Sequence, residues 1–327
     1  MITNKKGLLL IGLLGVGAIF LFLVPIFASR FTVFILYLLF LNIVLAQSWN
    51  LVGGYTGLIS LGHAAFFGIG AYSAAILMSE LQFPFIIAVL AGGGLAVAFA
   101  IIIAFPTFRF RGVYFAIGTL ILAEALRIWM INWEFTGGAQ GVQFPISRIP
   151  SLNSFYYMML TAAIVVTAVV TLILQRKLGL GLRAIRDNEE SAQNMGVNIF
   201  RTKLFSFTIS AFMTGLIGAI HATRLSVIEP YSIFGVNWTI NMINIVIIGG
   251  MGTIIGPIIG AIFITFLGEA LADFYTVHLM ITGVIFILVI RFMPEGIWGW
   301  FQQTAFAKKI VDWFLEDGPM ASGFTGD

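Results

Sequence analysis

Cysteine is absent from the 327-residue chain, and charged residues are scarce. Without cysteine the chain can form neither a disulfide bond nor a thiolate metal site. Asp, Glu, Lys and Arg make up 9% of the residues, whereas soluble domains carry roughly 25%. Apolar residues account for 60%, and the 36 glycines permit close helix contacts in lipid. We therefore predict an all-α polytopic membrane protein.

Motifs of common catalytic and nucleotide-binding sites are also missing. The sequence contains no G-x-x-x-x-G-K-[ST] phosphate loop, no H-E-x-x-H and no G-x-S-x-G. Its glycine-rich stretches lie inside apolar runs and follow no predicted strand, which excludes a nucleotide cradle. The basic residues form no nucleic-acid patch. We expect no enzyme activity, no metal site, no nucleic-acid partner and no cofactor in this chain. Any ATP that drives the protein would sit on another polypeptide.

Long apolar runs predict about ten membrane-spanning helices, some of them short or broken. The candidate spans are 7–28, 31–49, 58–79, 84–105, 113–133, 153–175, 204–224, 235–250, 256–274 and 276–292. Most approach the ~20 residues that cross a bilayer. The first run is longer than the apolar core of a cleaved signal peptide, so we expect it to be retained.

The distribution of Lys and Arg predicts the orientation. With the N-terminus in the cytoplasm, ten crossings return the C-terminus to the same side. Thirteen Lys and Arg then lie inside and three outside, in agreement with the positive-inside rule. We therefore predict a transmembrane domain over 1–293 and a cytoplasmic tail over 294–327, with an interfacial helix near 297–315.

The most polar stretch, 176–203, lies between two apolar runs and is called the knob. It reads RKLGLGLRAIRDNEESAQNMGVNIFRTK and holds nine of the 31 charged residues. Its glycine pair predicts a break in the incoming helix. Asp187 and Glu190 resemble a capping box that opens a second short helix, and Gly196 suits the end of that helix. The knob is either a solvated loop that only sets topology or a docking element for a soluble partner.

Two stretches place glycine and polar groups at or near membrane depth. They are 50–57 (NLVGGYTG) and 249–257 (GGMGTIIGP). Such backbone is tolerated only where it is buried in protein or lines a watery cavity. Paired interruptions of this kind are typical of internally repeated transporters.

Polar side chains inside predicted spans are candidate functional groups. Glu124 and Arg127 are three residues apart, as are Asn241 and Asn244, so each pair can share one helix face. His63 lies early in the third span. The alternative roles are structural: a self-neutralising ion pair for Glu124 and Arg127, and a satisfied packing residue for His63.

Four sequence blocks, spread in order over 54–261, match a known pattern. They are GYTGLISLGHAAFFGIGAY (54–72), RGVYFAIGTLILAEALRIWMINWEFTGGAQG (111–141), GLGLRAIRDNEESAQNMGVN (179–198) and IGGMGTIIGPIIGA (248–261). Through them the chain resembles the permease subunits of branched-chain amino acid ABC importers, in particular the larger of the two paired subunits. The third block is the most specific, because it is long, polar and unusual in a membrane protein.

The resemblance implies half of a type II ABC importer in a prokaryotic plasma (inner) membrane. Its implied partners are a second homologous permease, two ATPase subunits that carry ATP, and an extracytoplasmic substrate-binding protein. The loop that corresponds to 179–198 would seat in the ATPase. The residues onto which this coupling role is carried are Gly181, Arg183, Ala184, Asp187 and Asn188.

An aliphatic amino acid needs an apolar route with a few polar steps for its charged ends. The candidate steps are Thr56, Ser60, Glu124, Thr136, Asn241 and Asn244. Where the family often reads Ser-Ile-Glu, this chain reads Thr-Ile-Asn at 239–241, which leaves urea or short amides open as substrates. The alternative from another class is a secondary transporter that uses Glu124 or Glu269 as a proton relay.

Overall fold

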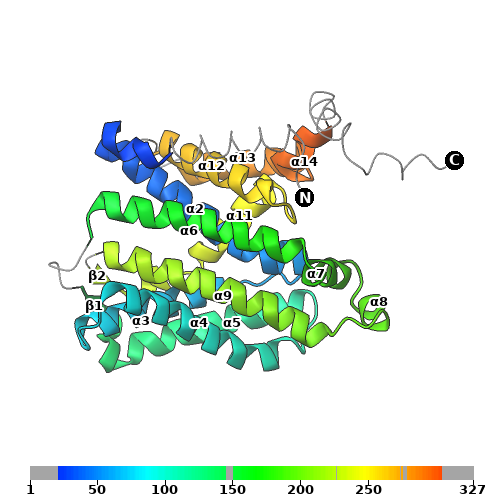
Figure 1. The fold of residues 1–327 in the computed structure, drawn as a ribbon, viewed down its shortest axis with the longest axis horizontal. Coiled ribbons are helices and arrows are strands. Elements are labelled where there is room, and N and C mark those ends of the chain that lie inside the picture. Colours follow the sequence, from blue (N-terminus) through cyan, green and yellow to red (C-terminus); the bar gives the residue numbers. More distant parts are fainter. Residues whose placement is uncertain (1–20, 145–149, 226, 273, 275–277, 304–327) are drawn as a thin grey trace, which may run out of the picture.

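The structure is a computed structural model that describes residues 21–144, 150–225, 227–272, 274 and 278–303. Within these ranges the chain is a helical bundle with one short two-stranded ladder (Figure 1). The helices are α2 (Arg30–Thr56), α3 (His63–Ser79), α4 (Phe85–Thr107), α5 (Val113–Asn132), η1 (Glu134–Thr136), η2 (Gly138–Gln140), α6 (Leu152–Leu174), α7 (Lys177–Asp187), α8 (Glu189–Asn194), α9 (Ile199–Arg224), α10 (Pro230–Ile233), α11 (Asn237–Gly249), α12 (Ile255–Ala270), α13 (His278–Phe292) and α14 (Gly296–Gln303).

The predicted all-α membrane architecture is confirmed. Seven helical stretches of the described residues are long and apolar enough to cross a membrane, and α3 and α12 are shorter apolar helices. Most of the predicted span at 7–28, and the part of the predicted interfacial helix beyond α14, lie outside the described residues.

Helices α2 and α9 are the most buried of the long apolar helices. On α9 this burial depends on small residues. A Cβ atom at Gly70 of α3 would overlap the backbone carbonyl of Gly215 on α9. The two backbones therefore touch, as small residues permit between membrane helices.

The two ends of the bundle carry different structures. Helices α7, α8 and α14 lie at one end, called the knob end, and the strands lie at the other (Figure 1). Strand β1 (Val142–Gln143) pairs antiparallel with β2 (Val227–Ile228), with Val142 opposite Ile228. This ladder joins the segment after α5 to the segment after α9.

The interruption predicted at 50–57 is wrong in position, because α2 continues to Thr56. The side chains of Trp49 and Asn50 fold over Gly53 and Gly54, where a Cβ atom would overlap them. The glycines therefore serve packing inside the helix. The helix ends at Gly57, whose φ of 76° is left-handed, and the non-helical backbone covers 57–62.

The break predicted at the knob's glycine pair is also wrong, because α7 runs through both glycines. The chain turns earlier, between Leu174 and Lys177. A Cβ atom at Gly179 would overlap the backbone of Leu174, so the missing side chain allows α7 to pack against the end of α6. The cap of α8 is Asn188, whose Oδ1 accepts from the Ser191 N–H at 2.8 Å, and not Asp187 as predicted.

Candidate coupling and translocation sites

The knob presents charged side chains outward and packs apolar ones inward. Leu182 and Ile185 of α7 are buried, and so is Gly181, while Arg183 and Asp187 are exposed. Asn188 is exposed at the start of α8, and Ala184 is half-buried. The five residues predicted to couple therefore divide into an inner part and an outer part of one compact element.

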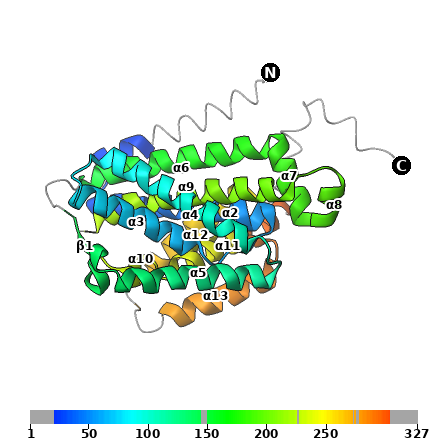
Figure 2. The same cartoon turned by 90° about the horizontal axis from the view of Figure 1, so that it is seen from below.

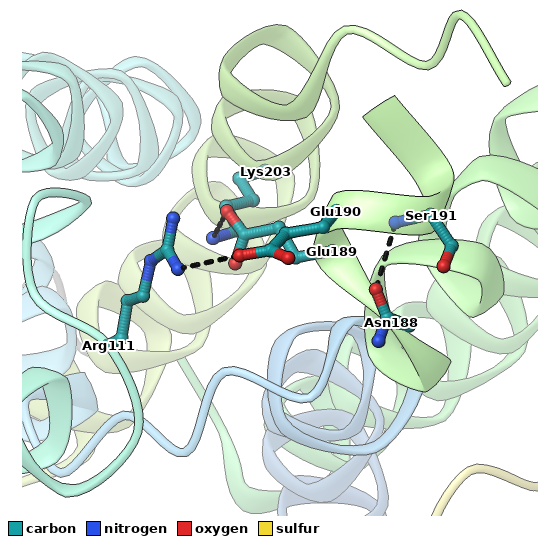
Figure 3. A network of polar contacts seen from close by, with 6 residues as sticks. All are labelled: Arg111, Asn188, Glu189, Glu190, Ser191 and Lys203. Atoms are coloured by element: carbon teal, nitrogen blue, oxygen red, sulfur yellow. Dashed lines mark hydrogen bonds and ion pairs between the residues drawn. The ribbon is translucent and has the colours of Figure 1, made fainter. Parts of the chain in front are cut away.

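Two ion pairs connect α8 to the membrane helices (Figure 3). Lys203 Nζ of α9 donates to Glu189 Oε1 at 2.7 Å, and the Lys203 side chain is only 3% exposed. Arg111, between α4 and α5, lies 3.6 Å from Glu190, and both side chains are more than 70% exposed. An exposed pair contributes about 0–1 kcal/mol, so the partly buried pair of Lys203 and Glu189 is the main electrostatic anchor of α8.

An apolar groove of about 410 Å³ opens between α7 and the start of α9. Its lining is Lys177, Leu178, Leu180, Gly181, Ala184, Met195, Val197, Asn198 and Thr202. Leu180 is 67% exposed and Met195 79% exposed. Sequence reasoning missed both residues, although large apolar side chains in so polar a segment were a usable signal. Exposed apolar patches rimmed by polar residues are typical of protein interaction sites.

The hydroxyls of Thr56, Ser60 and Thr136 are buried. Thr56 Oγ1 donates to the Leu51 carbonyl at 3.0 Å, and Thr136 Oγ1 donates to the Trp133 carbonyl at 2.8 Å. The structure therefore places these three candidates inside the packing of the bundle, each with hydrogen bonds to neighbouring groups.

His63 is buried in a hydrogen-bond chain that holds the 57–62 segment. Ser210 Oγ donates its one proton to the Ser48 carbonyl at 2.6 Å. In its 2.9 Å contact with Ser210, His63 Nε2 must therefore be the donor. His63 Nδ1 then accepts from Ser60 Oγ at 3.1 Å. Both ring nitrogens are satisfied, in agreement with the structural role considered for His63.

Helix α11 carries a partly exposed face with amide groups. Asn241 and Asn244 are half-buried, and the neighbouring Ile240 and Ile247 are exposed. Asn241 Nδ2 donates to Asn42 Oδ1 at 3.0 Å. Among the described residues no hydrogen bond is formed by the Asn244 side chain.

Glu124 and Arg127 form the predicted ion pair on α5. Arg127 Nε donates to Glu124 Oε2 at 2.9 Å, and a second bond joins Arg127 Nη2 to Glu124 Oε1. The Arg127 guanidinium also lies 5.3 Å from the ring centre of Tyr231. Helices α5 and α13 lie on the same side of the molecule (Figure 2). In the view of Figure 1, α11 is drawn below α13 and above α5.

Comparisons with known proteins identify the family of the chain. The family described as "Branched-chain amino acid transport system / permease component" matches residues 31–290. The high-affinity branched-chain amino acid transport system permease protein LivM of Escherichia coli (strain K12) is 30% identical, over 90% of this chain and 75% of the relative. The permease protein LivH of the same strain is 25% identical, over 78% of this chain and 90% of the relative.

A ribose import permease protein, RbsC of Haemophilus influenzae, is 34% identical over a shorter stretch, 34% of this chain and 36% of the relative. No solved structure matches the chain.

Proposed function

This chain belongs to the branched-chain amino acid transport system permease family, and from that premise we propose that it is the transmembrane permease subunit of an ABC importer for branched-chain amino acids. The observation that carries the proposal is the match over 31–290, because this range contains both the knob and the amide-bearing face of α11. The chain itself performs no catalysis. ATP binds to a partner ATPase, and the knob and both termini face the cytoplasm.

We assign the coupling role to the outer surface of the knob. Arg183, Asp187 and Asn188 are exposed there and can meet polar groups of an ATPase. Leu180 and Met195 border the groove beside them, and apolar anchors surrounded by polar residues commonly supply most of the binding energy of an interface. The buried Lys203 pair keeps α8 in place, so that force on the knob reaches α9.

We assign the translocation path to the side of the molecule that carries α5, α11 and α13. The α11 face offers amides at Asn241 and Asn244 for the charged ends of a zwitterion, and Ile240 and Ile247 for its aliphatic part. A second homologous permease covers this side in the assembly, and a binding protein delivers substrate at the end that carries the β1–β2 ladder. Thr56, Ser60 and Thr136 support the surrounding helices.

Purification from the native membrane, without cross-linker, tests the proposal. We expect an ATPase and a second permease to co-elute with the chain. The double variant Arg183→Glu with Asp187→Lys should lose the ATPase and keep the permease partner. Arg30→Glu is the matched control, because Arg30 is exposed at the opposite end of the bundle. Retention of the ATPase by the double variant would return the knob to a topology-setting role.

The substrate class needs its own measurement, since Asn241 stands where the family often has a carboxylate. Competition against leucine uptake by the other branched-chain amino acids, urea and acetamide separates the two substrate classes. We expect competition by the amino acids alone. Competition by urea or acetamide would instead favour an amide permease.

A further inference from the structure

The turn between α11 and α12, residues 250–254, is fixed to α2 by buried side chains. Asn50 Nδ2 donates to the Thr253 carbonyl at 2.8 Å, and the Gly252 N–H donates to Asn50 Oδ1 at 2.9 Å. Gln47 Nε2 donates to the Ile254 carbonyl at 2.7 Å. Asn50 and Gln47 are fully buried. The two glycine-containing stretches of the chain thus meet, and one asparagine bonds to two successive residues of the turn.

The knob contacts the same turn through Arg186, near the end of α7. A Cβ atom built at Gly57 would lie 3.6 Å from Arg186 Cβ, so the stem of Arg186 passes beside the end of α2. A Cβ atom at Gly252 would overlap Arg186 Nη1. The guanidinium therefore lies directly on the backbone of the turn. Gly252 has a φ of 75°, a left-handed conformation that also favours glycine.

Helix α14 holds the turn from another direction. A Cβ atom at Gly296 would overlap the backbone of Gly250, and a Cβ atom at Gly250 would lie 3.4 Å from Trp298 Cβ. The turn is therefore enclosed by α2, α7 and α14. The turn follows directly on α11, and Asn244 lies five residues, about 7.5 Å along the helix axis, before the last residue of that helix, Gly249.

We propose that the 250–254 turn receives the movement of the knob, and that Arg186 is the positioning residue that transmits it to α11. When α7 is displaced, either the contact between the Arg186 guanidinium and Gly252 breaks or the turn moves together with α7. Because the turn is closely packed, it moves as a unit between discrete arrangements. Asn50 holds the turn in one of these arrangements. The inference rests on the proposed function, since it requires an ATPase at the knob and a path along α11.

The test uses the complete complex in proteoliposomes, with ATP hydrolysis and leucine uptake measured in the same preparation. Arg186→Ala should retain the ATPase and hydrolyse ATP within about twofold of the wild type, while uptake per ATP falls about fivefold or more, the lower range of measured coupling between sites. Arg186→Lys should recover part of the loss. Arg109→Ala, which removes an exposed basic residue between α4 and α5 and outside the knob, should behave as the wild type.

Three outcomes would overturn the inference. Unchanged uptake per ATP in Arg186→Ala would leave the proposed function standing and remove Arg186 from the coupling route. Loss of the ATPase from that variant would make Arg186 a docking residue. Failure of the wild-type chain to bind any ATPase would remove both the proposed function and the inference.

A second variant changes the other partner of the contact between Arg186 and Gly252. Gly252→Ala should also lower uptake per ATP, because its methyl group displaces the guanidinium. Gly268→Ala, where nothing lies within 4 Å of the added Cβ, is its matched control. Normal uptake per ATP by correctly folded Gly252→Ala would contradict the proposed contact.

Discussion

Replacement of Asn50 by alanine should destabilise the protein more than expected from the few side-chain atoms that are removed. The side chain makes one bond to the Thr253 carbonyl and one to the Gly252 N–H, and it is fully buried. Each buried backbone group left without a partner costs about 1–3 kcal/mol, so the loss of both predicts about 2–6 kcal/mol. Asn50→Asp keeps the acceptor for Gly252 but points a carboxylate oxygen at the Thr253 carbonyl, so it should not rescue stability.

The assay is thermal unfolding of the detergent-purified protein, followed by loss of the monodisperse peak after heating. Asn132→Ala is the matched control, because Asn132 is exposed and, within the described part of the chain, its side chain bonds only to the Ile128 carbonyl of its own helix. It should change stability by less than about 0.5 kcal/mol. If Asn50→Ala and Asn132→Ala unfold at the same temperature, the bonds from α2 do not hold the 250–254 turn, and the reasoning fails.

Three further predictions use two matched pairs and one half-buried residue of α11. Gly70→Ala should destabilise the bundle by about 1–3 kcal/mol, because the added methyl group pushes α3 away from α9. Gly94→Ala is the control, since nothing lies within 4 Å of its added Cβ atom, and equal melting temperatures of the two variants would refute the backbone contact. Glu189→Gln keeps an acceptor oxygen but removes the negative charge opposite the buried Lys203, and it should lower stability by about 1–3 kcal/mol. Glu190→Gln should lower it by less than about 1 kcal/mol, and proteolysis of the knob compares the two variants. Asn244→Ala should lower leucine uptake with an unchanged melting temperature, and normal uptake would remove Asn244 from the path.

Much of the fold could be predicted from local sequence. Long apolar runs gave positions close to α4, α5, α6 and α9, because burial in lipid is a property of each segment alone. The knob stood out because its charge density differs from that of its surroundings. The Glu124 and Arg127 pair followed from helical spacing, since both residues lie on one helix.

Contacts between distant segments could not be predicted in this way. Asn50 and Gly252 are 202 residues apart, and the sequence around either residue does not indicate that the two form a hydrogen bond. The glycines of α2 and α7 were interpreted as breaks because glycine lowers helix propensity by about 1 kcal/mol. In the folded chain the same glycines allow side chains and neighbouring backbones to pack closely, and that tertiary gain exceeds the local loss. Nor could the burial of Thr56 be predicted locally, since Thr56 Oγ1 donates to Ser206 Oγ at 3.3 Å, 150 residues further along the chain.

The most direct test of the central claim is leucine uptake by proteoliposomes that contain the purified complex and binding protein, with ATP supplied on the ATPase side. The account predicts uptake that requires ATP hydrolysis, depends on the binding protein and is unaffected by collapse of the proton gradient. Uptake by the isolated chain without ATP, driven by a proton gradient, would contradict it and favour a secondary transporter.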